Sequence, residues 1–215
     1  MYDFIHTQND VLRERYIAGA ELVGKYQVPQ LQPINARLDG LMPVPINLAG
    51  KEKNPRECVL HCFVDDVKFE GIWKDPLKQI ETLKYYSYFC PCDFSFYYTM
   101  PLAVQINQIY RMRAIHHFLT CCGVKCIPVV TWSDESSFDF CFDGLPKEST
   151  LAVSTNSCHT IRAREYYKRG FAEMCERLRP TQILVVGAEI PVECDVPIVY
   201  MDGFSQQRKK RMEAV

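Results

Sequence analysis

The stretch from Phe89 to Trp132 constrains the fold of this chain most, because it has the pattern of one complete βαβ unit. An apolar strand is followed by a turn, a long helical segment, a Cys-Gly stop and a second apolar strand. In such units the strand ends and the start of the helix share one edge of the sheet, where ligands usually bind. Asp93 and Ser95 follow the first strand and Trp132 ends the second, so we expect these side chains at that edge.

Short apolar segments of strand length alternate with helical segments along the rest of the chain. The expected strands are 58–64, 151–155, 183–186 and 197–201, and the expected helices are 76–86, 100–122 and 160–178. This alternation is typical of an α/β fold whose mostly parallel sheet is covered by helices. We predict about six strands flanked by helices, doubly wound or partly barrel-like, because six strands are too few for a complete eight-stranded barrel.

The N-terminal part of the chain has a different pattern. Residues 9–24 carry apolar side chains at helical spacing and end at Gly24, which predicts a short helix. Residues 26–50 contain four prolines, which predicts an extended arm across the domain or, alternatively, a loosely attached linker. We therefore divide the chain into this helix and arm (1–50), one α/β domain (51–205) and a basic tail (206–215). Within the domain, residues 133–144 alternate polar and apolar side chains up to the turn pair Asp143-Gly144.

The overall charge of the chain argues against some classes of partner. The 25 basic residues nearly balance the 26 acidic ones, so a dedicated nucleic-acid coat is not expected. The run Arg208–Arg211 is interpreted as a solvated tail, with a weak phosphate-backbone contact as the alternative. No apolar run approaches membrane-spanning length, so we expect no membrane partner.

The eleven cysteines favour a reducing compartment. Their number is odd, the chain is not short, and its N-terminus lacks the pattern of a signal peptide. Several of them lie in apolar runs, where a thiol packs as a small hydrophobic group. We therefore expect a cytoplasmic protein. The closely spaced cysteines at 90 and 92 and at 121, 122 and 126 do not form spaced C-x-x-C pairs, so structural zinc is the less favoured alternative.

Polar side chains follow successive predicted strands, and a parallel sheet would gather them at one edge. They are Asp65, Asp66, Asp93, Ser95, Thr131, Trp132, Asp134, Thr155, Asn156 and Glu189. Capping of the following helices is the favoured interpretation for Ser95 and Asn156. For Asp93 with Asp65 or Asp66 a functional role stays open, because neighbouring carboxylates repel each other unless they are paired or bound to a metal such as Mg²⁺ or Mn²⁺.

The long helix predicted over 100–122 has a basic residue on its apolar face. Arg113 falls inside that face, and a buried guanidinium needs a partner to offset the cost of leaving water. We expect it to reach an acid at a strand end, with Asp93 the nearest candidate in sequence. The pair would then be structural, or Arg113 would instead bind an anionic group of a ligand. Walker, dinucleotide-binding, serine-hydrolase and zincin motifs are absent from the sequence.

Four segments together resemble a known family. They are HCFVDDVKFEGIWKDP (61–76), CDFSFYYTMPLAVQINQIYRMR (92–113), IPVVTWSDESSFDFCFDGLPK (127–147) and LAVST (151–155). In this order they resemble DUF4417, a bacterial and phage domain of unknown function, over roughly residues 40 to 190. Members commonly have Pro-Asp-Phe-Ser where this chain has Cys92-Asp93-Phe94-Ser95. The resemblance implies a phage or mobile-element context and no particular activity. The positions that it highlights are Asp65, Asp66, Phe69, Asp93, Ser95, Gln105, Asn107, Tyr110, Arg113, Trp132 and Asp143.

These observations lead to one main hypothesis and two alternatives. The main hypothesis is an acid-lined pocket that binds, and in one version hydrolyses, a small anionic or nucleotide-like molecule. In it, Asp93 with Asp65 or Asp66 would be the metal ligands or the general acid and base, Arg113 the anion clamp and Trp132 a stacking wall. One alternative is an interaction protein that inhibits a host defence partner through residues 26–50 and 96–98. Nucleic-acid binding through the basic tail is the weaker alternative.

Overall fold

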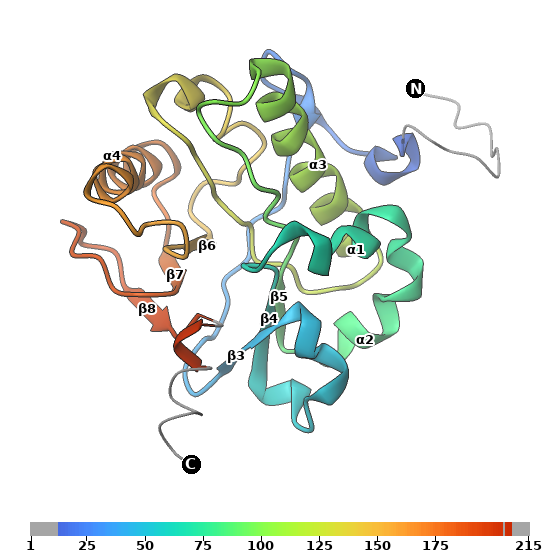
Figure 1. The fold of residues 1–215 in the computed structure, drawn as a ribbon. Coiled ribbons are helices and arrows are strands. Elements are labelled where there is room, and N and C mark those ends of the chain that lie inside the picture. Colours follow the sequence, from blue (N-terminus) through green and yellow to red (C-terminus); the bar gives the residue numbers. More distant parts are fainter. Residues whose placement is uncertain (1–12, 204, 208–215) are drawn as a thin grey trace.

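The computed structural model describes residues 13–203 and 205–207, and it contains two three-stranded parallel sheets (Figure 1). In the first sheet β4 (Cys58–His61) lies between β3 (Met42–Pro45) and β5 (Tyr88–Cys90). In the second sheet β7 (Gln182–Val186) lies between β6 (Thr150–Ser154) and β8 (Ile198–Met201). All four strand pairings in these two sheets are parallel. The predicted α/β class with parallel strands is thus confirmed, whereas one sheet of six strands is not.

The segment between the two sheets was predicted to be a strand, and it is not one. Cys126 makes an isolated parallel bridge to Phe89 of β5, and Val129 makes another to Ala152 of β6. Pro128 lies between these bridges and has no N–H to donate, so no continuous ladder forms there. The segment pairs first with one sheet and then with the other. Over the described residues the sheets do not close into a barrel.

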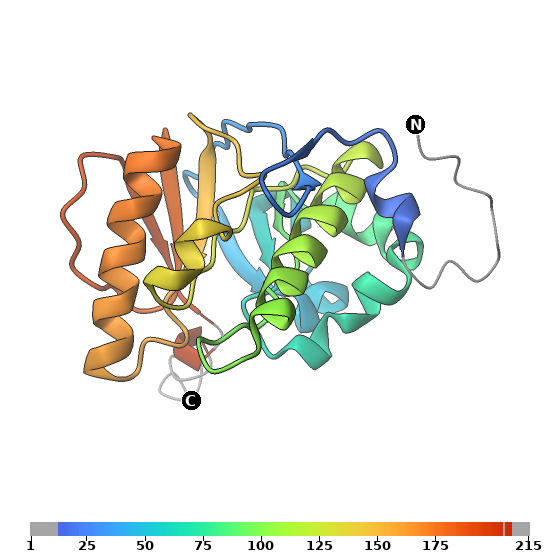
Figure 2. The same ribbon diagram turned by 90° about the horizontal axis from the view of Figure 1, so that it is seen from above.

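Two long helices confirm the helical periodicity of the sequence. Helix α3 (Leu102–Cys121) follows β5, and α4 (Ile161–Leu178) follows β6. Thr160 caps α4, because its hydroxyl oxygen accepts a hydrogen bond of 3.1 Å from the Ala163 N–H. The buried face of α4 includes Tyr167 and Phe171, as its spacing predicts. Figure 2 shows α4 along the outer side of the β6–β8 sheet, with α3 near the middle of the molecule.

The remaining helices are short. Helices α1 (Glu70–Lys74) and α2 (Ile80–Tyr85) lie in the connection from β4 to β5. The 3-10 helices are η1 (Glu14–Ile17), η2 (Ile46–Lys51), η3 (Pro55–Glu57), η4 (Asp66–Lys68), η5 (Pro76–Lys78) and η6 (Glu135–Asp139). The predicted helix over 76–86 is therefore divided between η5 and α2. Residues 133–144 form no strand, because the Asp134 carboxylate accepts a hydrogen bond from the Ser136 N–H and begins η6 instead.

The predicted helix over 9–24 is wrong in its described part. Residues 9–12 lie outside the described residues, and only η1 is helical in the remainder. Gly19 and Gly24 adopt φ angles of 74° and 71°, a left-handed conformation that interrupts a helix. The short strand β1 (Leu22–Val23) then pairs antiparallel with β2 (Val28–Pro29).

The proline-rich arm packs on the domain and contributes to its first sheet. Strand β3 lies within the arm and pairs with β4. Earlier in the arm, the Ile34 carbonyl accepts a hydrogen bond of 2.7 Å from the Thr150 N–H, at the start of β6. The Ile34 N–H in turn donates to Ser149 Oγ at 2.9 Å. The arm thus crosses the domain from the start of β6 to the carboxyl end of β3. Most of the predicted basic tail, 208–215, lies outside the described residues.

Within the described part of the chain, none of the helices has the length and apolar character that crossing a membrane requires. All eleven cysteines lie in the described part and are free thiols.

Candidate functional site

A cavity of about 670 Å³ lies at the carboxyl ends of the strands of both sheets. Its walls come from residues that follow β3, β4 and β5, from the segment between the two sheets, from the end of β6 and the loop after it, and from the first turns of α4. They include Asn47, Asp65, Lys68, Asp93, Ser95, Tyr97, Tyr98, Trp132, Ser154, Asn156, His159, Tyr166 and Tyr167. Segments far apart in the sequence therefore meet here because parallel strands end at a common edge. Asp65, Asp93 and Trp132, which the sequence analysis placed at this edge, all line the cavity.

The carboxyl group of Asp93 contains the one buried polar atom of this wall that lacks a hydrogen-bond partner among the described residues. Its Oδ1 atom is shielded from solvent and has no hydrogen-bond partner in the described part of the chain. Burial, with a contribution from the negative charge of Asp66, raises the pKa of the Asp93 carboxyl to about 7. The side chain is therefore divided between its neutral and ionised forms near neutral pH. A buried acceptor without a partner is costly, which makes this position a candidate for ligand binding.

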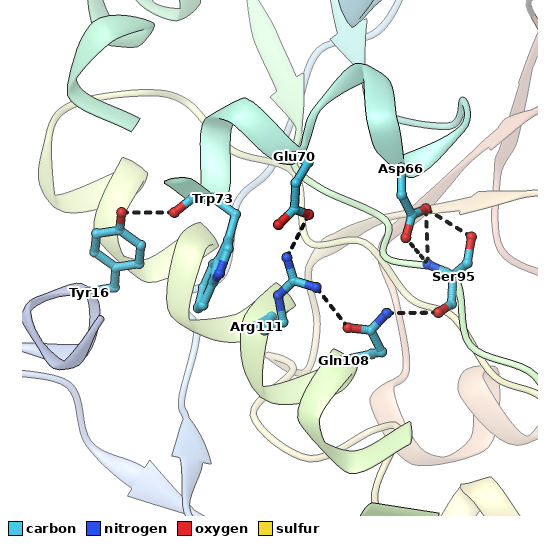
Figure 3. Close-up of polar contacts among 7 residues, drawn as sticks. All are labelled: Tyr16, Asp66, Glu70, Trp73, Ser95, Gln108 and Arg111. Atoms are coloured by element: carbon cyan, nitrogen blue, oxygen red, sulfur yellow. Dashed lines mark hydrogen bonds and ion pairs between the residues drawn. The ribbon is translucent and has the colours of Figure 1, made fainter. Parts of the chain in front are cut away.

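Asp66 was predicted to share the role of Asp93, but its contacts are structural (Figure 3). Its carboxylate accepts hydrogen bonds from the Ser95 N–H at 3.1 Å and from the Ser95 hydroxyl at 2.8 Å. The Ser95 carbonyl accepts from Gln108 Nε2 at 2.9 Å, and Gln108 Oε1 accepts from Arg111 at 3.0 Å. Arg111 completes the chain with an ion pair of 2.7 Å to Glu70. This network fixes the loop after β5, and so holds Asp93 in place.

Trp132 forms an inner aromatic wall of the cavity. Its indole N–H donates a hydrogen bond of 3.0 Å to the Tyr166 carbonyl in α4, and its ring lies 5.7 Å from that of Tyr167. Gly170 makes this position possible, because a Cβ atom there would lie 2.2 Å from the indole nitrogen. The buried arc of α4 therefore contains a glycine where the tryptophan ring packs.

The outer wall is formed by aromatic side chains near the mouth. Tyr97 and Tyr98 are 52% and 48% exposed although they line the cavity. The Arg162 guanidinium lies 5.2 Å from the centre of the Tyr98 ring and 5.3 Å from that of Tyr166. Its Nε also donates to the Tyr166 hydroxyl at 2.9 Å. This cluster joins the loop after β5 to α4 at the entrance.

The other polar residues of the rim differ in their exposure and in their hydrogen bonds. Asp65 and Lys68 are exposed. Asn156 donates from Nδ2 to the Phe63 carbonyl at 2.8 Å, which connects the ends of β4 and β6. The Thr155 hydroxyl donates to the Ala188 carbonyl at 2.8 Å, and Thr155 is not among the described residues that line the cavity.

Arg113 is buried as predicted, but the expected pairing with Asp93 is wrong. Its Nε donates to the Asp143 carbonyl at 2.9 Å, and its terminal nitrogens donate to the carbonyls of Cys141 at 2.7 Å and Val129 at 3.4 Å. Burial lowers the pKa of this guanidinium to about 10, so it remains charged at neutral pH. Three backbone carbonyls supply the acceptors that a carboxylate was expected to provide. Arg113 is not among the cavity-lining residues, and its position does not support an anion clamp.

Five other predicted residues also lie outside the set of described residues that line the cavity. They are Gln105, Asn107, Tyr110, Asp134 and Asp143. Gln105 is buried and donates to the Met100 carbonyl at 2.9 Å, within the turn that begins α3. Asn107 is exposed, Tyr110 is partly buried, and Asp134 caps η6. Phe69, which the family resemblance highlighted, is a core residue that packs against Phe94.

Sequence reasoning missed part of the wall. Lys68, His159 and Tyr166 line the cavity although no motif singled them out. Tyr97 and Tyr98 were considered only as a protein-contact surface. Their position directly after Asp93, in the same loop after a strand, is the signal that would have placed them at the cavity.

The described part of the chain does not contain a group of three or more His, Cys, Asp or Glu side chains arranged to hold a metal ion. No residues can therefore be assigned to the Mg²⁺ or Mn²⁺ that the sequence analysis considered. The same applies to zinc at the closely spaced cysteines.

The comparison with known families decides which family the chain represents. A family model described as domain of unknown function (DUF4417) matches residues 20–201. The chain belongs to this family. The predicted family resemblance is thereby confirmed, and the match includes every residue of the cavity wall named above.

Two phage proteins are similar to this DUF4417 chain. The Gene 1 protein of Mycobacterium phage L5 is 32% identical over 167 residues, which cover 75% of this chain and 71% of that protein. The Gene 1 protein of Mycobacterium phage D29 is 29% identical over 170 residues, which cover 75% of this chain and 60% of that protein. No solved structure matches the DUF4417 chain. The phage association expected from the sequence is therefore supported by relatives, whereas their names state no activity.

The raised pKa of Asp93 predicts a specific dependence of stability on pH. A carboxyl whose pKa rises from 3.8 to about 7 on folding destabilises the folded state when it is ionised, so its cost grows as pH rises through this window. We expect Asp93→Asn to increase the free energy of unfolding by about 1–3 kcal/mol near pH 8, with the gain shrinking toward pH 5. Urea unfolding at both pH values measures this. The exposed Asp65→Asn is the control, and a gain that does not change with pH would contradict the assignment.

Proposed function

We propose that the cavity binds a small planar molecule of the nucleotide type, and that binding at Asp93 is its central interaction. The observation that carries the proposal is the unpartnered Oδ1 of Asp93 in an aromatic wall. A volume of about 670 Å³ is in the range of small-molecule sites. Such sites combine mostly apolar walls with a few polar groups that fix orientation.

The aromatic residues favour a flat ligand. Trp132 and Tyr167 are held on one side through α4, and Tyr97 and Tyr98 extend into the mouth from the loop after β5. Stacking of a nucleobase on such side chains contributes about 1–3 kcal/mol per base, largely independently of its identity. A planar heterocycle between these walls would also cover the buried carboxyl.

The charges favour an orientation with any phosphate toward the solvent. The inner part of the cavity contains the Asp93 carboxyl, which repels an anion when it is ionised. Lys68 lies at the rim, and Arg162 lies against Tyr98 at the mouth. Arg113 does not line the cavity, so Lys68 and Arg162 take the role of binding the phosphate that the sequence analysis gave to Arg113.

The proposal has two versions. In the first the protein only binds the nucleotide, and in the second it also hydrolyses it. A carboxyl with a pKa of about 7 suits a general acid or base at neutral pH. The relatives are phage proteins. In a phage setting, the proposed role of a cytoplasmic protein with this cavity is to sequester or degrade a host signalling nucleotide. Incubating the nucleotide with the protein in the presence of Mg²⁺ or Mn²⁺ distinguishes the two versions. Sequestration leaves the nucleotide unchanged, whereas hydrolysis yields a product.

The outer tyrosines provide a direct test of the proposal. We expect Tyr97→Ala with Tyr98→Ala to weaken nucleotide binding about 10- to 100-fold, since stacking surface is lost from exposed side chains with little cost to folding. Calorimetric titration with a panel of nucleoside monophosphates measures the change. Tyr85→Ala is the matched control, because Tyr85 is similarly exposed, at 58%, and lies on α2 away from the cavity. Wild-type protein that binds no member of the panel would refute the proposal.

A second candidate function is inhibition of a host protein through the surface. Besides the two tyrosines, Leu102 and Val104 at the start of α3 are 53% and 43% exposed, so residues 97–104 present several apolar side chains. The arm is less suited to this role, because it is hydrogen-bonded to the domain. This candidate predicts that Leu102→Ser with Val104→Ser abolishes activity in cells while Asp93→Asn preserves it. The cavity proposal predicts the reverse.

A further inference from the structure

We propose that the ligand is a guanine nucleotide, whose N1–H and 2-amino group both donate hydrogen bonds to the carboxylate of Asp93. The inference rests on the proposed function and adds the identity of the base. The base must have an edge complementary to the hydrogen-bonding groups of the cavity wall that are available to a ligand.

Several other polar side chains of the wall already have partners. The Ser95 hydroxyl donates to Asp66, and the Trp132 indole donates to the Tyr166 carbonyl. The Asn156 amide donates to the Phe63 carbonyl, and the Ser154 hydroxyl donates to the Val186 carbonyl. Asp93 differs from them, because its buried Oδ1 has no partner in the described part of the chain. The wall therefore offers one buried acceptor without a partner, which a ligand would satisfy with a donor.

An ionised carboxylate accepts hydrogen bonds through two oxygens and donates none. It is matched by an edge with two adjacent donors. Guanine has this edge in its N1–H and 2-amino groups, whereas adenine and cytosine each place an acceptor next to their amino group. Uracil places an acceptor on each side of its N–H. An edge with an acceptor would face the carboxylate oxygens unfavourably, so guanine is the common base that fits.

The surroundings of Asp93 couple this recognition to pH. Guanine requires the ionised form, and the pKa of the free side chain is about 7, so affinity should rise with pH and level off above neutrality. The groups that act on Asp93 or share its cavity are Cys62, Asp66, Cys90, Asp65, Lys68 and His159. Burial raises the pKa values of the Cys62 and Cys90 thiols, so both remain neutral throughout this window. His159 is exposed at the rim, and His159→Gln serves as the control for its contribution.

The test compares the monophosphates of guanosine, inosine, adenosine and xanthosine, titrated calorimetrically into wild type and Asp93→Asn near pH 8. Wild type should bind guanosine monophosphate best. Inosine lacks the 2-amino group and should bind roughly 10- to 100-fold more weakly, and adenosine more weakly still. In Asp93→Asn an amide oxygen and an amide N–H replace the two carboxylate oxygens, which matches the N1–H and the 2-oxo group of xanthine. The preference should therefore reverse from guanosine to xanthosine.

The outcomes separate this inference from the proposed function. Equal binding of all four nucleotides, or a preference for adenosine, would overturn the guanine assignment and leave nucleotide binding in place. Tighter binding of arginine, whose guanidinium also has paired donors, would overturn it as well. Absence of binding by every nucleotide would overturn both proposals. If Asp93→Asn does not fold, the pH dependence of wild-type binding tests the guanine assignment. The affinity for guanosine monophosphate must fall about tenfold per pH unit below neutrality, and a constant affinity would overturn the assignment.

Discussion

Replacing Arg113 by methionine is expected to lower the free energy of unfolding by about 3–5 kcal/mol. The guanidinium donates to the carbonyls of Val129, Cys141 and Asp143, which joins the segment between the sheets to the loop after η6. Methionine has a similar length and no donors, so these carbonyls would be left in the interior without this partner. Urea unfolding monitored by circular dichroism measures the loss.

The control for this change is Arg37→Met. Arg37 is exposed, and its substitution should alter stability by less than about 0.5 kcal/mol. The experiment also discriminates between the two roles considered for Arg113. An anion clamp would give a stable variant that has lost ligand binding, and that result would contradict the structural role described here.

Replacing Gly170 by alanine is expected to lower the free energy of unfolding by about 2–3 kcal/mol and to weaken ligand binding. The added Cβ would lie 2.2–2.4 Å from atoms of the Trp132 ring, so the indole must move from its position between α4 and the cavity. The hydrogen bond from the indole to the Tyr166 carbonyl would be lost with it. Because Trp132 is one of only two tryptophans, its fluorescence reports the movement directly.

Gly71 in α1 provides the matched control. A Cβ at this position would meet nothing within 4 Å, so Gly71→Ala should leave stability unchanged or raise it by up to about 1 kcal/mol through helix propensity. An equal effect of the two glycine substitutions would mean that the contact with Trp132 has no special role. A destabilised Gly170→Ala with unchanged tryptophan emission would contradict the proposed packing of the indole.

The sequence predicts which segments meet at the cavity better than it predicts the contacts of their side chains. Asp65, Asp93 and Trp132 meet at one cavity because strand direction and the βαβ pattern determine which chain segments share an edge. The same pattern does not determine the direction of a side chain within a turn. Asp66 is adjacent to Asp65, yet it faces the loop after β5, because the η4 turn directs its carboxylate to the Ser95 N–H.

The partners of buried polar groups were the least predictable part. Helical spacing correctly placed Arg113 on the buried face of α3, but the acceptors proved to be carbonyls of two other segments, 16 to 30 residues further along the chain. Backbone carbonyls are present at every residue, so no sequence pattern marks them. The strand expected around Val129 failed for a local reason, since Pro128 interrupts the ladder between the two sheets. Long-range loop geometry and local backbone chemistry thus account for these two errors.

A co-crystal structure with guanosine monophosphate tests the central claim most directly, because it locates the ligand relative to Asp93. We predict the base between Trp132 and the outer tyrosines, with its N1 and 2-amino nitrogens about 2.7–3.0 Å from the two Asp93 carboxylate oxygens and its phosphate toward Lys68. Ligand bound elsewhere on the protein, with the Asp93 carboxyl still without a partner, would contradict the account.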